Sequence, residues 1–194
     1  EKLSVTRLSL AIAVFTFVVY MIPGMWGAPL KALSGYLPPI QTHDFIVDHQ
    51  GLKGEVEIIK DFEEALIKAE KENKPIFVDV TGHGCVNCRE MEERVWSHPT
   101  VLEMLRNDFV IVALYVDDKH KLPEEDWVTD AETGKVYKDL GRVNSYIARE
   151  RFNVNAQPNY VLLSPDGEIL VPTHKYDLEP QNFINFLQSG LDAY

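Results

Sequence analysis

Residues 76–96 read IFVDVTGHGCVNCREMEERVW, and this stretch decides the fold. Residues 76–80 form a near-continuous apolar run, which is typical of a strand buried on both faces. A glycine-containing loop leads to the motif CVNC at residues 85–88, and the charged run that follows places the second cysteine, Met91 and Val95 on one helical face. The stretch therefore predicts a buried strand that turns into a helix, with a pair of cysteines at the turn.

The segments on either side predict further strands and helices around this unit. Residues 76–80 and 109–116 are joined by helical segments and should be parallel neighbours, as in a strand–helix–strand crossover. Residues 164–167 read SPDG, a turn sequence that predicts an antiparallel hairpin between strands 160–163 and 168–171. The remaining expected elements are a short strand at 56–59 and helices at 62–73, from 98 onward, at 143–152 and at 180–190. The chain is thus expected to be an α/β protein with a mixed central sheet flanked by helices.

Composition excludes several classes of protein. The chain has 194 residues, with 19 Lys and Arg against 30 Asp and Glu, and a formal net charge of −11. Its 45% hydrophobic and 25% charged content excludes wholesale disorder. The acidic balance argues against nucleic-acid binding, which needs a basic face. Two cysteines are too few for a disulfide-rich scaffold or a four-thiolate zinc site.

The first part of the chain differs in character from the rest. Residues 8–30 contain no Asp, Glu, Lys, Arg or His, and a helix of that length would span roughly 34 Å, enough for the core of a bilayer. We expect a membrane-spanning helix with a cytoplasmic N-terminus, because Lys2 and Arg7 precede it and only Lys31 follows closely. A signal peptide and a buried core helix are the alternatives. The chain begins with Glu1, so we expect it to be processed or to be part of a longer protein.

The expected organisation has three parts. Residues 1–40 comprise the membrane helix and its flanks, residues 41–60 a linker and the first short strand, and residues 61–194 the globular domain. Within this domain, the polar and acidic segment 118–142 is predicted to be an insertion with a turn at 130–134. Its acids are expected to be a solvated excursion, with a docking surface as the alternative.

The cysteine pair is the feature that carries chemistry. Two cysteines at positions i and i+3 of a first helical turn have Cα atoms roughly 5–6 Å apart, so a disulfide can form and open without backbone movement. Cys85, near the N-cap, faces free N–H groups and the positive end of the helix dipole, which lower the pKa of a thiol. Cys88 lies one turn further in and should be more buried. We therefore predict Cys85 as the attacking thiolate and Cys88 as the resolving thiol.

Other roles for the motif are a structural disulfide, an inert buried pair or a metal site. His83, Cys85 and Cys88 offer three ligands to zinc, but a fourth is missing. Covalent haem attachment requires a histidine directly after the second cysteine, where this chain has Arg89. We expect neither a metal nor a cofactor.

Three features together resemble the thioredoxin fold: the strand with Asp79, the helix that begins at CVNC, and the stretch NAQPNY at 155–160 before a hairpin. More narrowly, CVNCREME at 85–92, preceded by an apolar segment that ends IPGMWGAP at 22–29, is similar to the C-terminal part of DsbD-type thiol:disulfide interchange proteins. The resemblance covers nearly the whole chain. It implies a last membrane helix followed by an exported thioredoxin-like domain.

The resemblance also implies roles for two acids. Asp79 matches the buried acid of the family, and burial should raise its pKa so that it exchanges a proton with Cys88. Glu92, one turn beyond Cys88, matches a second acid that lies near the cysteines, and a solvated helix face is the alternative for it. Both charges would disfavour a nearby thiolate and hold reactivity back until a partner docks.

Pro158 matches the cis-proline that the family places opposite the cysteine pair, with an ordinary trans proline as the alternative. A cis bond there would present the Gln157 backbone to an incoming peptide, which could add as a short strand. Gly84 departs from the family, which usually has tryptophan at this position, so the loop should be more flexible. His83 either tunes the pKa of Cys85 or is simply exposed. These four residues are expected to line the side on which a substrate docks.

The function implied by the resemblance is that of a protein-disulfide reductase. Electrons would come from a membrane electron-donor domain, reach Cys85 and Cys88, and pass to exported thiol/disulfide proteins in the periplasm. A disulfide oxidase or isomerase of the same fold is one alternative, because the direction depends on a reduction potential. A metal- or peptide-binding module whose thiols do not turn over is the other.

Overall fold

The chain divides into two compact units, residues 1–51 and 52–194, and the computed structural model describes residues 4–23 of the first and 56–194 of the second. In the first unit, Ser4 caps helix α1 (Val5–Met21) by accepting a hydrogen bond from the Arg7 N–H. Among the described residues, no helix combines the length and the apolar character that crossing a bilayer demands. Part of the expected membrane segment, 24–30, and most of the expected linker, 41–55, lie outside the described residues.

The second unit is built on a five-stranded mixed sheet with the order β1-β3-β2-β6-β7. Strands β1 and β2 both run parallel to β3, while β6 pairs antiparallel with β2, and β7 antiparallel with β6. The central strand β2 is buried along its whole length, as its apolar sequence predicts. The strands are β1 (Ile58–Ile59), β2 (Ile76–Thr81), β3 (Val110–Tyr115), β6 (Asn159–Leu163) and β7 (His174–Lys175).

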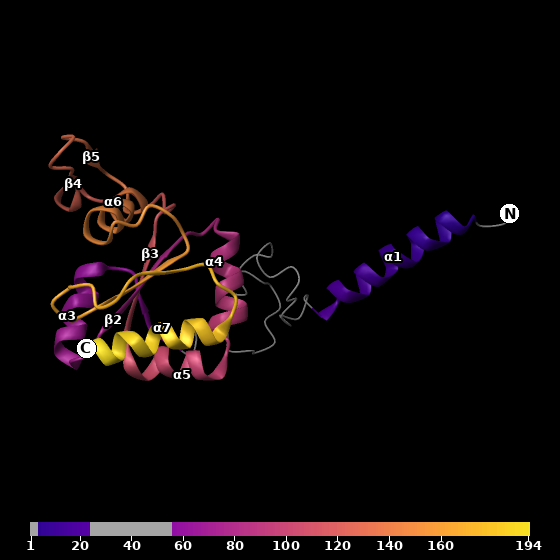
Figure 1. Cartoon of the computed structure of the whole chain (residues 1–194). Coiled ribbons are helices and arrows are strands. Elements are labelled where there is room, and N and C mark those ends of the chain that lie inside the picture. The colour runs from indigo at the N-terminus through magenta and orange to yellow at the C-terminus, as the bar shows by residue number, and fades with distance from the viewer. Residues whose placement is uncertain (1–3, 24–55) are drawn as a thin grey trace. The chain divides into compact units, whose positions relative to one another are not determined.

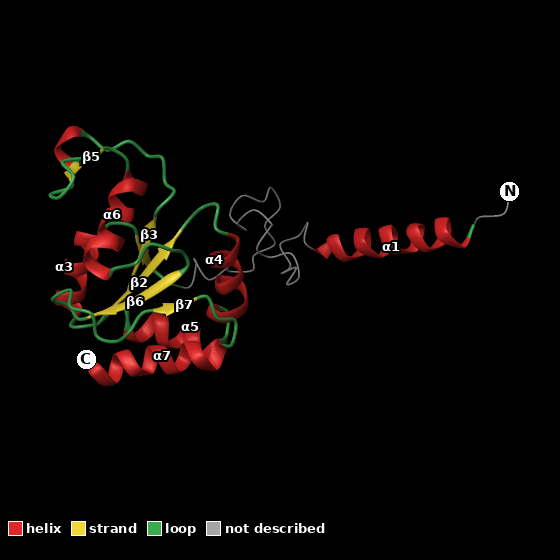
Figure 2. Ribbon diagram, turned by 45° about the horizontal axis from the view of Figure 1, so that its top comes forward, coloured by secondary structure: helices red, strands yellow, loops and turns green. Residues whose placement is uncertain are grey.

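Helices cover both faces of this sheet (Figures 1 and 2). Along β2, Ile76, Val78 and Val80 point to the face covered by α3 and α6, and Phe77 points to the face covered by α4, α5 and α7. Strand alternation places Asp79 on the same face as Phe77. The helices are α3 (Phe62–Glu72), α4 (Val86–Met91) with its π-helical continuation η4 (Glu92–Trp96), α5 (Pro99–Asp108), α6 (Leu140–Phe152) and α7 (Pro180–Ala193).

Most of the predicted elements are present, including helix α3, which Asp61 caps, and the parallel pairing of β2 with β3. Helix α6 begins at Leu140, three residues before its predicted start, because Asp139 caps it by accepting the Arg142 N–H across Gly141.

The prediction of a strand at residues 168–171 is wrong. The SPDG turn forms, and the Leu170 N–H donates to the Leu162 carbonyl, but only Ile169 bridges to β6 before the chain leaves it. The strand that pairs with β6 is β7, whose register is shifted by two residues relative to that bridge. Pro172 lies within the shift and has no N–H to donate, which accounts for the break in the ladder.

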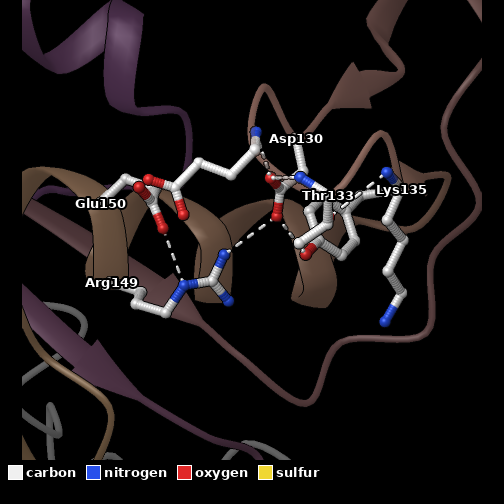
Figure 3. Close-up of polar contacts among 7 residues, drawn as sticks. Asp130, Thr133, Lys135, Arg149 and Glu150 are labelled. Atoms are coloured by element: carbon white, nitrogen blue, oxygen red, sulfur yellow. Dashed lines mark hydrogen bonds and ion pairs between the residues drawn. The ribbon is translucent and has the colours of Figure 1, made fainter.

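The acidic segment between β3 and α6 is a structured excursion. It contains the short helix η5 (Glu124–Asp126) and a two-stranded hairpin of β4 (Val128–Thr129) and β5 (Val136–Tyr137). The predicted turn at 130–134 connects these two strands. Figure 3 shows the buried Asp130 carboxylate between the Thr133 backbone and the Arg149 guanidinium, which donates to it over 3.3 Å. The hydrogen bond from the Thr133 N–H is the main cause that lowers the pKa of Asp130. Asp130 thus ties the hairpin to α6.

Candidate active site

The two cysteines lie where β2 passes into α4, and they are joined by a disulfide. Cys85 is the N-cap of α4, and its sulfur accepts a hydrogen bond of 3.1 Å from the Cys88 N–H. The two Cα atoms are 5.3 Å apart, within the range predicted from the i, i+3 spacing. Cys85 is 8% exposed and Cys88 2%, so the first cysteine is the more accessible one, as expected.

The loop before Cys85 is held by side chains from elsewhere in the domain. The N–H groups of His83 and Gly84 each donate to one oxygen of the Asp117 carboxylate over 2.7 Å. On the other side, the Arg89 guanidinium donates to the His83 carbonyl over 2.6 Å. These contacts argue against the greater flexibility that the absence of an aromatic residue at Gly84 had suggested. Asp117 was not identified from the sequence, since nothing in an acidic loop marks which carboxylate turns toward the cysteines.

His83 is exposed, with 57% of its side chain accessible. Its ring stacks on Tyr115 at the end of β3, with the ring centroids 4.2 Å apart. Its Nε2 atom lies 3.3 Å from an oxygen of Asp118, whose pKa is lowered first by a hydrogen bond from the His120 N–H and further by His83 itself. The imidazole is therefore anchored to β3 and the loop that follows it, whichever of the two predicted roles it has.

The two predicted acids come together around a buried tyrosine. Asp79 is only 3% exposed and stands directly opposite Tyr160 in the β2–β6 pair, while Glu92 is half-buried at the start of η4. The pKa of the Tyr160 hydroxyl is raised well above its usual value, first by burial and then by the charges of Asp79 and Glu92. The negative charges of both acids therefore affect the same buried apolar region around Tyr160, which lies beneath α4. This placement agrees with the burial predicted for Asp79 and leaves Glu92 more enclosed than a solvated helix face would be.

The predicted proline also lies at this end of the sheet. The Gln157–Pro158 peptide bond is cis, as the resemblance implied. Strand β6 begins directly afterwards, with Asn159 opposite Val80, so the proline comes alongside the end of β2. The Gln157 amide lies against the loop, because a Cβ atom on Gly82 would be only 2.8 Å from its Nε2. The structure thus brings Gln157 and Pro158 to the cysteine loop from a distant part of the sequence.

A metal site has no support in the residues that the structure describes. Across 4–23 and 56–194, no three His, Cys, Asp or Glu side chains gather as a metal would require. The three ligands considered in the sequence are not assembled, since the two sulfurs are bonded to each other and the His83 ring stacks on Tyr115.

Comparisons with known proteins agree with this fold. A family model described as thioredoxin-like matches residues 57–140. Among solved structures, the DsbH oxidoreductase superposes with a TM-score of 0.53 and 17% identity, covering 71% of this chain and 85% of that one. A thioredoxin from Thermus thermophilus superposes with a TM-score of 0.50 and 21% identity, covering 69% of this chain and 85% of that one.

A curated relative matches part of the same region. Human spermatogenesis-associated protein 20 is 39% identical over 97 residues, which is 50% of this chain. The match covers 11% of that protein's own length, so this chain corresponds to a small part of it.

Proposed function

From a thioredoxin-like fold with a disulfide at the start of α4, we propose that this chain is a thiol–disulfide oxidoreductase. The observation that carries the proposal is the placement of Cys85 and Cys88 one helical turn apart, next to the Gln157–Pro158 peptide. A disulfide that served only to staple the fold would link distant segments, because closing a longer loop gives more stability. This disulfide joins residues of one turn, which suits a bond that opens and closes.

The proposed reaction moves two electrons from the reduced cysteine pair to a partner disulfide. The Cys85 thiolate attacks one partner sulfur, which breaks the partner S–S bond and releases the other partner sulfur as a thiolate that takes up a proton. The Cys88 thiolate, having lost its own proton, then attacks the Cys85 sulfur. That step forms the Cys85–Cys88 disulfide and releases the second partner thiol. The greater exposure of Cys85 supports its role as the attacking group.

For the direction of transfer, we propose a DsbD-like reductant. Support comes from the two acids near Tyr160, since negative charge in a poorly solvated region disfavours a cysteine thiolate. A less stable reduced form makes the dithiol a stronger electron donor. The disulfide must then be reduced again by a donor dithiol, which we assign to a membrane electron-donor domain, and exported thiol/disulfide proteins are the acceptors.

We further propose that residues 8–30 attach the domain to a membrane, with the cysteine pair on the periplasmic side. Support comes from the uncharged sequence of this segment and from α1, whose large apolar side chains, such as Leu10 and Phe15, are exposed. Alkaline extraction of membranes from cells that express the chain tests this proposal. We expect the chain to stay in the membrane fraction, and a Val14→Arg variant to be released more readily. Release of the unmodified chain would contradict the anchor.

A trapping experiment tests the redox function. The Cys88→Ala variant, lacking the resolving thiol, should accumulate mixed disulfides through Cys85, and the Cys85→Ala variant should trap far less. Mass spectrometry of the trapped species identifies the partners. Equal or stronger trapping by Cys85→Ala would reverse the assigned roles.

Equilibration with glutathione separates the reductant from its alternatives. A reduction potential well below that of the compartment supports the reductant, and a high potential supports an oxidase or isomerase. A pair that never exchanges with glutathione, and that holds a metal ion stoichiometrically when reduced, would support a binding module instead.

A further inference from the structure

The loop between β2 and α4 contains two glycines, yet its peptide groups are almost all engaged. The Gly82 carbonyl accepts from the Cys85 N–H over 3.1 Å, and the His83 carbonyl accepts from Arg89. The N–H groups of His83 and Gly84 both donate to Asp117. One carboxylate therefore accepts from two successive N–H groups of the segment that leads directly into Cys85.

Asp117 is held in place by the rest of the domain. It follows β3 by two residues, and the chain on both sides of it is tied to α6. The Tyr115 carbonyl accepts from the Asn144 side-chain amide over 3.1 Å, and the Asp118 carbonyl accepts from the Gly141 N–H over 3.0 Å. The backbone that carries the carboxylate is therefore fixed, although Asp117 itself is exposed to solvent.

Gly82 in particular allows this close approach. A Cβ atom on Gly82 would lie 3.0 Å from one Asp117 oxygen, tighter than ordinary contact, and a Cβ on Gly84 would lie 3.4 Å from the same oxygen. The absence of a side chain at Gly82 therefore makes room for a negative charge beside the backbone of the loop.

We propose that Asp117 is a positioning residue for the Cys85–Cys88 pair, which fixes the loop and shifts the dithiol–disulfide equilibrium toward the disulfide. The proposal rests on the redox function proposed above. Its physical basis is twofold. A fixed carboxylate repels a thiolate that forms at Cys85. The carboxylate also occupies the two N–H groups that could otherwise turn toward that sulfur and stabilise it.

The reaction to be measured is the reduction of the protein disulfide by two glutathione molecules, which yields the protein dithiol and glutathione disulfide. Asp117→Asn removes the charge and keeps one acceptor, whereas Asp117→Ala removes the charge and both acceptors. Asp118→Asn is the matched control, since it removes the neighbouring charge without touching the loop backbone. The other charged or titratable groups on the elements around the pair are unchanged in the Asp117 variants. They include His83 in the loop, Arg89 and Glu90 on α4, Glu92 on η4, Asp79 on β2, Tyr115 and Asp118 at and after the end of β3, and Tyr160 on β6.

At pH 9, where a thiol with an ordinary pKa is largely ionised, we expect both Asp117 variants to raise the equilibrium constant for reduction about five- to tenfold. At pH 6 a thiol with an ordinary pKa is protonated, so the difference should fall below about twofold. Asp118→Asn should stay within about twofold of the wild-type value at both pH values. Amide hydrogen exchange at His83 and Gly84 in the oxidised protein should be faster than in wild type, more so for Asp117→Ala than for Asp117→Asn.

Unchanged equilibrium constants in the Asp117 variants, or an equal change in Asp118→Asn, would overturn the positioning role while leaving the redox function intact. A wild-type protein that does not equilibrate with glutathione at all would overturn both proposals. If Asp117→Ala does not fold, Asp117→Asn, which keeps the shape of the side chain, decides the question.

Discussion

Replacing Gly141 with alanine would push a methyl group into the backbone of the loop that carries Asp117. A Cβ atom on Gly141 would lie 2.5 Å from the Asp118 carbonyl oxygen, 2.7 Å from the Asp118 nitrogen and 2.8 Å from the Val116 carbonyl oxygen. All three are backbone atoms, so no side chain can swing aside to relieve the contact. Either α6 or the loop must move.

The sign of the effect follows from three contributions. Overpacking of this kind costs about 1–3 kcal/mol, and loss of the hydrogen bond from the Gly141 N–H to Asp118 costs about 1 kcal/mol. Alanine offsets roughly 1 kcal/mol of this destabilisation, because it restricts the unfolded chain more than glycine does. We therefore expect Gly141→Ala to lower the free energy of unfolding by about 1–3 kcal/mol.

Urea unfolding followed by far-ultraviolet circular dichroism measures this change. Gly84→Ala is the control, because its Cβ would make only an ordinary contact of 3.4 Å with Asp117, and it should stay within about 0.5 kcal/mol of wild type. A displaced loop should also release the amides of His83 and Gly84, so their hydrogen exchange in Gly141→Ala should quicken. A Gly141→Ala variant as stable as the control would refute the close approach of α6 to this loop.

Three further predictions concern the rest of the domain. The pKa of His174 is lowered mainly by burial, so its neutral form is favoured in the folded state. The free energy of unfolding should therefore decline as the pH falls below about 6.5. His174→Phe should remove that decline in unfolding experiments run from pH 7.5 to 5. Asp61→Ala, which removes the N-cap of α3, should lower the free energy of unfolding by about 1 kcal/mol, whereas Glu63→Ala in the same helix should change it by less than half as much in urea titrations. Phe77→Ala, at the centre of the aromatic cluster and fully buried, should lower the stability by about 3–5 kcal/mol, and a loss below 1 kcal/mol in thermal or urea unfolding would contradict that packing.

Much of the fold was predictable because its signals are local. The apolar run of β2, the cap of α3 and the turn at 164–167 each depend on residues close in sequence, and each appears in the structure. The strand expected at 168–171 failed because pairing is not a local property. Where a strand joins the sheet depends on the register of its partner and on which N–H groups are available, and Pro172 removes one of them.

For the candidate site, the sequence alone determined the spacing and chemistry of Cys85 and Cys88, because one helical turn brings residues i and i+3 together wherever the helix lies. It could not determine which side chains from distant parts of the chain contact that turn. Asp117 reaches the loop only because β2 and β3 are parallel neighbours that end at the same edge, and Gln157 only because β6 returns antiparallel beside β2. Contacts between segments so distant in the chain are decided by sheet order and packing, so only the tertiary structure identifies the carboxylate that holds the loop.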